Sequence, residues 1–350
     1  MGVVFHQVSK VFGDGTVALD RLDLAFDKGE FVVLLGPSGS GKTTACRILA
    51  GLEMPTSGHV EVDGRDITAL PPRERGMSMV FQNYALYAHR TAYENIAYPL
   101  RVRGFPKAEI DDMVREIAAM LEIERLLRRR PRQLSGGEAQ RVAVARALVW
   151  QPDICLMDEP LSNLDALLRL QTRTELKRLH RELAKTFVFV THDQEEAMTL
   201  GTRIAVLREG RLVQFDTPQR IYRQPATRFV AEFIGRPAMN TVDGVVQDGV
   251  FRADAFALPV PGRPDGPVVL GIRPEALAMC ANDEEGVEFT VDVVELVEPD
   301  TLLFVKKGGI PLVARLMRDA ELLAPGATVR LAFPPEQLHF FDPETGTRLA

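Results

Sequence analysis

Gly36-Pro37-Ser38-Gly39-Ser40-Gly41-Lys42-Thr43 is the stretch that decides the fold of this chain. Its spacing matches Gly-x-x-x-x-Gly-Lys-[Ser/Thr], the phosphate-binding loop of nucleotide hydrolases. The preceding run, Phe31–Leu35, is apolar throughout, as expected for a strand buried on both faces. After the loop, residues 44–50 carry apolar side chains at helical spacing, and Gly51 is a typical helix end. The loop therefore lies between a strand and a helix, and the sequence predicts a nucleoside triphosphate site.

The residue types of the loop explain how it would hold phosphate. Glycines allow successive backbone N–H groups to turn toward phosphate oxygens, and the start of the helix adds partial positive charge. A helix dipole contributes only about 0.3–1 kcal/mol, whereas micromolar binding requires about 8 kcal/mol. We therefore expect the N–H groups, the Lys42 ammonium and a Mg²⁺ ion held by the Thr43 hydroxyl to supply most of the binding energy. Thr44, the next residue, is assigned to the same nucleotide site.

Composition limits the remaining possibilities. The chain has 350 residues, which suggests two domains, and 46% hydrophobic with 26% charged residues, which is ordinary for a globular protein. A net charge of −6 argues against nucleic acid as the main partner. The three cysteines lie far apart and are expected to be reduced core residues. No apolar run approaches the roughly 18–20 residues that cross a bilayer and no signal peptide is recognisable, so any work at a membrane would need other chains.

The strands around the loop place further candidate residues. Phe12 lies shortly before the loop and is a candidate for stacking on a purine ring, with an ordinary core or hairpin aromatic as the alternative. Gln82 follows a predicted strand over residues 77–81. The other strands expected in this part of the chain cover residues 3–8 and 59–64.

Two carboxylates end another apolar strand, residues 154–157. Asp158 and Glu159 would be costly at the end of a buried strand unless a cation were present, and a Mg²⁺-binding Asp belongs beside a phosphate loop. Glu159 is then placed to polarise an attacking water. His192 follows one more buried strand, residues 187–191, and can reach a γ-phosphate from there, although a lone His is more often structural.

Residues 92–148 are mostly helical in pattern. Residues 108–123 carry a helical apolar stripe, which we interpret as core packing. A tight glycine turn at residues 133–138 opens a second helix over residues 139–148. Between the two helices lies an arginine cluster, for which a solvated face is favoured over a membrane or nucleic-acid patch: Arg125, Arg128, Arg129, Arg130 and Arg132.

The amino-acid composition and the hydrophobic pattern change after Gly235. Pro and Gly become denser, helical patterns vanish and short strand-like runs recur, which together predict a small all-β barrel. The expected domains are therefore residues 1–235, with a helical subdomain at about 88–150, and residues 236–350. The strands expected in the barrel are residues 242–247, 268–272, 287–297, 302–305, 311–316 and 329–333.

Taken together, these motifs resemble the ATP-binding cassette family, the motor subunits of membrane transporters. The discriminating element is Leu134–Gly137, because many nucleotide hydrolases share the phosphate loop. It is followed in family order by Asp158-Glu159, residues 162–165 (Ser-Asn-Leu-Asp) and residues 191–193 (Thr-His-Asp). The resemblance covers residues 1 to about 235 and implies an α/β P-loop NTPase core of RecA-like type with a helical subdomain.

Finer matches narrow the resemblance to the ATPases of carbohydrate importers of the maltose and glycerol-3-phosphate type. They are residues 80–87 (Val-Phe-Gln-Asn-Tyr-Ala-Leu-Tyr) and residues 192–199 (His-Asp-Gln-Glu-Glu-Ala-Met-Thr). Residues 233–240 and 270–275 match that subfamily's entry into a C-terminal OB-like regulatory barrel of TOBE type. The resemblance implies a homodimeric ATPase that acts with ATP and Mg²⁺ on the cytoplasmic face of the membrane. Its implied partners are two transmembrane permease subunits and, indirectly, an extracytoplasmic solute-binding protein.

The resemblance also implies individual roles. Phe12 would stack on adenine, Gln82 would sense Mg²⁺ and water, Asp158 would be a Mg²⁺ ligand, and His192 would contact the γ-phosphate, with Glu159 as the base. In the family's head-to-tail dimer, Asp165 lies at the interface. A second copy of the chain completes each nucleotide site with three residues: Ser135, Gly136 and Gly137.

Three positions depart from the family pattern. Glu138 replaces the usual Gln after the Leu-Ser-Gly-Gly string, and we expect only a modest effect because backbone and Ser135 contacts carry phosphate binding. Residues 88–90 read Ala-His-Arg where the subfamily has Pro-His-Met, beside the implied permease contact, which leaves the partner's identity open. Residues 296–299 read Leu-Val-Glu-Pro in place of a Pro-Leu-Gly turn, so no regulatory ligand of the barrel is transferred.

The resulting hypothesis is ATP hydrolysis coupled to uptake of a sugar, sugar alcohol or glycerol-phosphate-like solute. The nearest alternative is the same motor serving polyamine, iron or anion uptake. A soluble cassette ATPase of repair or translation would need fused cassettes or coiled-coil insertions, and the chain has one phosphate loop and no heptad tract. An oligonucleotide-binding barrel is disfavoured by the acidic charge and by a content of only five Tyr and one Trp.

Overall fold

The computed structural model describes residues 2–280, 286–317 and 323–349. The chain divides into two compact units, Met1–Pro218 and Gln219–Ala350. The helix α8 (Arg228–Phe233) therefore belongs to the second unit, although it precedes the composition change at Gly235 from which the sequence places its boundary. Each unit is described by itself below.

The first unit is built on a six-stranded sheet of order β10-β9-β3-β8-β7-β6. The pairs from β9 to β6 are parallel, and β10 is antiparallel to β9. The three central strands β3, β7 and β8 are buried at every position, which is why they read as continuous apolar runs. The bounds are β3 (Phe31–Leu35), β6 (Met77–Val80), β7 (Ile154–Asp158), β8 (Thr186–Thr191), β9 (Arg203–Arg208) and β10 (Arg211–Asp216).

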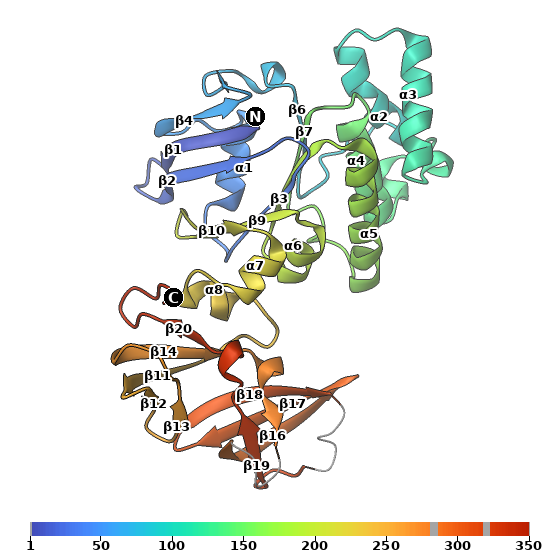
Figure 1. Ribbon diagram of the computed structural model, residues 1–350. Helices are drawn as coiled ribbons and strands as arrows, with labels where there is room; N and C mark the ends of the chain where they lie inside the picture. Colours follow the sequence, from blue (N-terminus) through green and yellow to red (C-terminus); the bar gives the residue numbers. More distant parts are fainter. Residues whose placement is uncertain (1, 281–285, 318–322, 350) are drawn as a thin grey trace. The chain divides into compact units, whose positions relative to one another are not determined.

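A second, antiparallel sheet of order β2-β1-β4-β5 packs with α1 (Lys42–Ala50) around a shared core. The buried side of this sheet includes Val3, Phe5 and Val60, and their neighbours His6 and His59 alternate to the other side. Figure 1 shows β1, β2, β4 and α1 grouped on one side of the unit. The bounds are β1 (Val3–Val11), β2 (Val17–Phe26), β4 (Ser57–Val62) and β5 (Arg65–Asp66).

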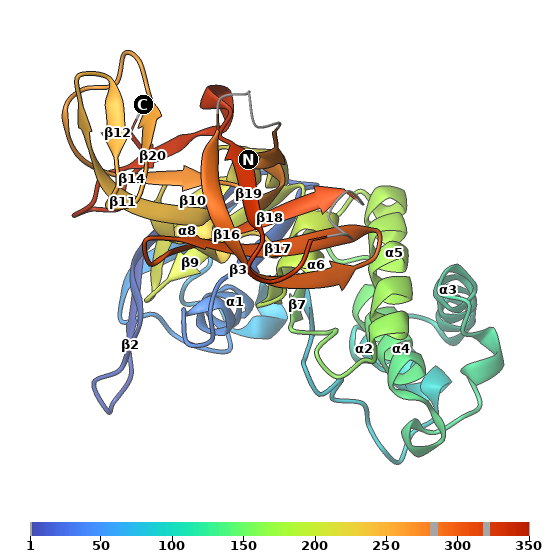
Figure 2. The same cartoon turned by 90° about the horizontal axis from the view of Figure 1, so that it is seen from below.

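Helices α2, α3 and α4 form a separate group on the side away from β1 and β2, with α3 outermost (Figures 1 and 2). The expected apolar stripe of α3 is buried through Ile110, Val114 and Ile117, but the helix ends at Met120 because Glu122 has a left-handed backbone (φ 56°). No helix among residues 2–280, 286–317 and 323–349 is long and apolar enough to cross a membrane. The bounds are α2 (Ala92–Val102), α3 (Lys107–Met120), α4 (Gly136–Leu148), α5 (Ala166–Leu183) and α6 (Gln194–Leu200).

The second unit begins with two short helices and continues as two five-stranded antiparallel sheets, of orders β13-β12-β11-β14-β20 and β15-β19-β16-β17-β18. Residues from both sheets share one core, including Phe251, Phe289 and Leu331. The six expected strands are present, and β12, β13, β15 and β20 are additional. The bounds are α7 (Pro218–Arg223), β11 (Asn240–Gln247), β12 (Val250–Arg252), β13 (Ala257–Pro259), β14 (Gly266–Ile272), β15 (Ala278–Met279), β16 (Val287–Val297), β17 (Asp300–Lys307), β18 (Ile310–Met317), β19 (Thr328–Ala332) and β20 (His339–Phe341).

The cysteines behave as ordinary core thiols. Cys46 and Cys155 are buried and Cys280 is half-buried, and none forms a disulfide. Burial raises the pKa of the Cys155 thiol to about 12, which leaves it protonated and unreactive at neutral pH.

Candidate nucleotide site

The candidate site lies where four parallel strands end at the same edge of the sheet. The phosphate loop follows β3, Gln82 comes two residues after β6, the acidic pair stands at the end of β7, and His192 comes directly after β8. The register pairs Leu35 with Thr191 and Asp158 with Val190, so these strand ends are level with one another. Ligands of open α/β sheets bind outside the carboxyl ends of the strands, and this sheet meets that condition.

Two glycines of the loop are required by close backbone contacts. A Cβ at Gly36 would lie 2.3 Å from the Leu207 carbonyl oxygen, and one at Gly41 would lie 2.3 Å from the Ala18 carbonyl oxygen. Gly41 also has φ 96°, a left-handed conformation that L side chains rarely adopt. The loop thus approaches β2 and β9 as closely as glycine allows, and it turns directly into α1.

The Lys42 side chain is hydrogen-bonded to the phosphate loop that contains it. Its side chain is buried, and Nζ donates to the carbonyl oxygens of Gly36 (2.9 Å) and Pro37 (2.7 Å) and to Ser40 Oγ (3.3 Å). Burial lowers the pKa of Lys42, and the nearby carboxylates Glu159 and Asp158 oppose that shift. The ammonium is therefore preorganised within the loop but only partly compensated by neutral carbonyl dipoles, which favours an anionic ligand.

A hollow of about 300 Å³ opens over the loop. Of the predicted nucleotide-binding residues, Ser38, Gly39, Gly41, Lys42, Thr43 and Thr44 line it, and Glu159 reaches it from β7. The start of β2 and the residue before it contribute three lining residues that the sequence did not indicate, namely Thr16, Val17 and Ala18. Val17 is 54% exposed there, and no sequence pattern could have found these residues, because their place depends on the packing of β2 against the loop.

The Asp158 carboxylate is the acceptor of a hydrogen bond from the Thr43 hydroxyl, with 2.8 Å between Thr43 Oγ1 and Asp158 Oδ1. Burial raises the pKa of Asp158, with the Thr43 hydrogen bond opposing the shift. A buried carboxylate beside a hydroxyl is a donor set of hard oxygens, the kind that Mg²⁺ prefers. Two of the three residues that the sequence assigns to the metal, Thr43 and Asp158, thus lie in contact and fit the ion chemically, and the third, Gln82, contacts Glu159.

Glu159 lies between the residues that follow the neighbouring strands. Its Oε1 is 3.4 Å from His192 Nδ1, and its Oε2 accepts from Gln82 Nε2 at 3.5 Å. The Glu159 backbone N–H donates to the Val190 carbonyl oxygen (3.1 Å), and the Glu159 carbonyl oxygen accepts a hydrogen bond from Ser162 Oγ (2.9 Å). These contacts hold Glu159 at the edge of the hollow that it lines. The structure brings together Gln82, Glu159 and His192 as the sequence expects.

Phe12 lies outside the residues that line the hollow. Its side chain is 39% exposed in the turn between β1 and β2, and Lys10 Nζ lies 5.1 Å from the ring centroid. Of the alternative, an ordinary core or hairpin aromatic, the core form is wrong, whereas the hairpin form fits the place of Phe12 in the β1–β2 turn. Its stacking on a base stays a prediction.

Ser135, Gly136 and Gly137 form the start of α4 and do not line the hollow of their own chain. Ser135 caps the helix, with its Oγ accepting from the Glu138 N–H (3.3 Å) while a Glu138 carboxylate oxygen accepts from the Ser135 N–H (3.0 Å). The extra charge of Glu138 faces Arg125 (3.8 Å) and Arg129 (3.7 Å). Two arginines of the predicted cluster therefore offset the negative charge that Glu138 adds where the family has Gln.

Asp165 and Gly137 also have structural roles, in addition to the roles expected of them at the dimer interface. Asp165 caps α5, since its Oδ1 accepts from the Leu168 N–H at 2.9 Å. A Cβ at Gly137 would lie 2.4 Å from a Leu168 methyl group, whereas one at Gly136 would be 3.6 Å from the nearest side chain. Gly137 thus allows α4 and α5 to pack closely.

We expect Gly137→Ala to be less stable than Gly136→Ala by about 1 kcal/mol, because the new methyl group must displace the partly exposed side chain of Leu168. Gly136→Ala is the matched control. It lies next in the chain, meets no close atom, and should be neutral or slightly stabilising because alanine favours the helix. Denaturant unfolding of both variants measures the difference. Equal stability of the two variants would contradict this account of the packing.

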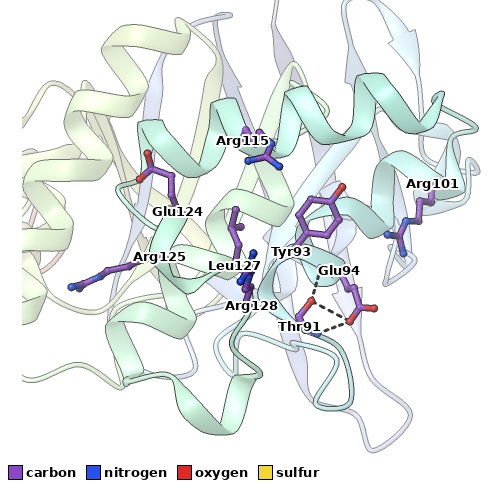
Figure 3. Close-up of a pocket in the computed structure, with 9 residues that line it drawn as sticks. All are labelled: Thr91, Tyr93, Glu94, Arg101, Arg115, Glu124, Arg125, Leu127 and Arg128. Carbon is purple, nitrogen blue, oxygen red and sulfur yellow. Dashed lines mark hydrogen bonds between the residues drawn. The ribbon is translucent and has the colours of Figure 1, made fainter.

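A second hollow, of about 690 Å³, lies among the helices and is unrelated to the strand ends. Figure 3 shows the Tyr93 ring within it, with Arg115 and Leu127 close by and Thr91 capping α2 through Glu94. The charged residues that line the hollow are four arginines and two glutamates: Arg101, Arg115, Arg125, Arg128, Glu94 and Glu124. The net charge of its lining is therefore +2. This hollow contains none of the residues at the strand ends.

Family models agree with this architecture. The model described as ABC transporter matches residues 19–162, which span the phosphate loop and both carboxylates. Models described as MalK OB fold domain and TOBE domain match residues 235–277 and 270–341. The chain belongs to the ATP-binding cassette ATPases of membrane transporters, in the branch that carries MalK-type OB and TOBE domains.

Full-length relatives define the branch more closely. The chain is 47% identical over 355 residues to the sn-glycerol-3-phosphate import ATP-binding protein UgpC of Salmonella typhi, covering 99% of both chains. It is 46% identical over 353 residues to UgpC of Yersinia enterocolitica, covering 98% of this chain and 97% of that protein.

Solved cassettes cover the first unit. The dimeric, post-hydrolysis structure of the cassette MJ0796 bound to ADP and Pi is 36% identical, with a TM-score of 0.56 over 62% of this chain and 98% of that one. CbiO1 of Clostridium perfringens, part of an ABC transporter complex, is 26% identical, with a TM-score of 0.59 over 63% and 89% of the two chains. Both structures match less than two thirds of this chain, whereas the UgpC proteins match nearly all of it.

Proposed function

We propose that this ATPase drives an importer of sn-glycerol-3-phosphate or a closely related sugar-type solute. The observation that carries the catalytic part is the contact set of Glu159 with Gln82 and His192 beside a phosphate loop. The cargo rests on the relatives, whose names state sn-glycerol-3-phosphate import and which match nearly the whole chain.

The loop residues would bind and orient ATP. Lys42 Nζ would exchange one or more of its bonds to loop carbonyls for phosphate oxygens, and the N–H groups that begin α1 would hold the same phosphates. Thr43 and Asp158 would hold Mg²⁺, which when bound neutralises charge on the phosphates, and Gln82 is assigned to the same ion and its water. Val17, an exposed residue that lines the hollow, and Phe12, exposed in the turn just before β2, would cover the adenine ring.

Glu159 would accept a proton from the attacking water, since it lies at the edge of the hollow and is oriented on two sides. His192, whose Nδ1 faces Glu159, would present its other ring nitrogen to the γ-phosphate. Phosphoryl transfer to water depends mainly on positioning and charge neutralisation, so this small set of groups is sufficient on one side of the phosphate.

A second copy of the chain would supply the other side. Ser135, Gly136 and Gly137 lie on a helix start that does not reach the hollow of its own chain. We propose that in a head-to-tail homodimer they contact the γ-phosphate bound to the partner, with Asp165 at the interface. The dimeric cassette of known structure supports this arrangement.

Permease subunits would dock on the segment from Gln82 to Glu94, at the cytoplasmic face of the membrane. Arg146 holds this segment by donating to the carbonyl oxygens of Tyr84 (2.8 Å) and Ala85 (2.7 Å). Arg90 lies 4.4 Å from the Tyr98 ring centroid, so the departure at this position adds a cation to the proposed contact surface. The positive hollow of Figure 3 continues the surface through Thr91 and Glu94. A solute-binding protein would act on the permeases from the other side.

Transport by the assembled complex tests the proposal. We expect the chain, reconstituted in proteoliposomes with the permeases and binding protein encoded beside it, to accumulate sn-glycerol-3-phosphate and to hydrolyse ATP faster when that solute is present. Maltose, spermidine and inorganic phosphate serve as competing cargoes. Stimulation by one of them instead of sn-glycerol-3-phosphate would assign the alternative cargo, and no ATP hydrolysis under any condition would refute the motor role.

A further inference from the structure

A group of two histidines and a glutamate lies on the first unit away from the nucleotide hollow. His6 on β1 and His59 on β4 are direct partners in the register of the antiparallel pair, so their side chains lie on the same face. The two rings stack, with centroids 4.5 Å apart and an angle of 19° between their planes. Glu61, two residues after His59, projects from the same face of β4. None of the three lines the nucleotide hollow.

The carboxylate of Glu61 lies between the same nitrogen atom of each ring. Its Oε1 is 3.2 Å from His59 Nε2, and its Oε2 is 3.5 Å from His6 Nε2. One ligand atom from each residue falls in a set within 4.8 Å of one another. Donors around a tetrahedral zinc ion, with bonds of about 2.0–2.1 Å, are about 3.3 Å apart. The two nitrogen–oxygen separations are of that size but involve different oxygens of Glu61, so the side chains must adjust before one carboxylate oxygen and both nitrogens can bind one ion.

His6 Nε2 is the second observation that points to a ligand. This atom is buried from solvent and has no hydrogen-bond partner among the described residues, with Glu61 Oε2 3.5 Å away. A buried ring nitrogen without a partner is costly unless something binds it. The side chains as a whole are 43%, 44% and 30% exposed for His6, His59 and Glu61, so the group lies at the surface although this one nitrogen is covered.

We propose that His6, His59 and Glu61 form a surface site for a divalent transition-metal ion of the Zn²⁺ class, with water as the fourth ligand. Two imidazoles and one carboxylate are a known zinc donor set, and imidazole suits Zn²⁺, Ni²⁺ and Cu²⁺ far better than Mg²⁺. The ion would clamp β1 to β4 at one cross-strand pair. The Asp66 carboxylate, opposite Glu61 in the β4–β5 register, adds negative charge nearby.

Calorimetric titration of the full chain with ZnCl₂, in a buffer that does not bind zinc and without nucleotide, tests the site. We expect one zinc ion to bind per chain, and His6→Gln or His59→Gln to weaken its binding at least tenfold. His89→Gln and His192→Gln are the matched controls, because one lies on another surface and the other in the nucleotide site. Both should bind zinc as the parent chain does, and MgCl₂ in place of zinc should give no heat at this site.

Histidine NMR signals provide a readout that does not depend on affinity alone. The Nε2 resonances of His6 and His59 should shift together on zinc addition while those of His339 stay unchanged. Circular dichroism checks that the Gln variants are folded. The proposal is overturned if the His6→Gln/His59→Gln double variant, folded by that criterion, binds zinc as tightly as the parent chain, or if the His192→Gln control alone removes the binding.

Discussion

Glu159→Gln should stop ATP turnover and leave ATP binding intact. The amide has the size of the carboxylate and keeps its contacts with Gln82 and His192, but it cannot accept a proton from water. Loss of a general base typically reduces the rate by 10²–10⁴-fold. We therefore expect hydrolysis to fall by about two orders of magnitude or more, while ATP affinity changes little.

Phosphate release and calorimetric ATP titration measure the two effects separately. With ATP and Mg²⁺ the variant should elute as a dimer, because the nucleotide that holds the two copies together is no longer consumed. Glu182→Gln is the control, since that carboxylate is exposed on α5 and pairs with Arg178 on the same helix, away from the nucleotide hollow. A Glu159→Gln chain that hydrolyses ATP at the control's rate would exclude Glu159 as the base.

A mixture of two inactive variants should recover a complete nucleotide site. Lys42→Ala removes the cation that the loop holds, and Ser135→Arg places a bulky cation where the Ser135 hydroxyl would donate to the partner's phosphate. A charge-assisted hydrogen bond of that kind contributes about 1.5–3 kcal/mol. In a mixed dimer one site carries both defects, while the other combines an intact Lys42 with an intact Ser135. We expect each pure variant to fail and the mixture to occlude ATP.

Occlusion of labelled ATP is the measurement, because coupling between the two sites can suppress steady turnover even when one site is complete. Distinct affinity tags on the two variants isolate the mixed dimer before the assay. A dimer of two Lys42→Ala chains that carry the two different tags is the negative control. If purified mixed dimers occlude no ATP, Ser135 does not act across the interface, and the proposed homodimer mechanism is wrong.

The sequence predicted the elements whose pattern is local. Phe31–Leu35 has the predicted bounds, and α1 ends at Ala50 before Gly51 as predicted, because a continuous apolar run and a glycine cap leave little freedom. The helix begins at Lys42, within the predicted loop rather than after it. The convergence of Gln82, Glu159 and His192 was also foreseeable, since each follows a strand of one parallel sheet. Their mutual distances were not, because they depend on the register of β7 and β8, which no local pattern specifies.

Other features depend on contacts distant in sequence. Thr16–Ala18 line the nucleotide hollow only because β2 passes within a van der Waals contact of Gly41. The short strands β12, β13 and β20 have too few residues to show alternation, and they exist because neighbouring strands offer free edges. The His6–His59 pair likewise follows from the cross-strand register and not from spacing.

The backbone of Glu159 has φ 45°, a left-handed conformation that a residue with a side chain adopts at a cost of about 1–2 kcal/mol. Glycine would relieve that cost and would tighten the fold at this point, yet it would remove the base. The proposed base and the local backbone therefore make opposite demands on the residue at this position.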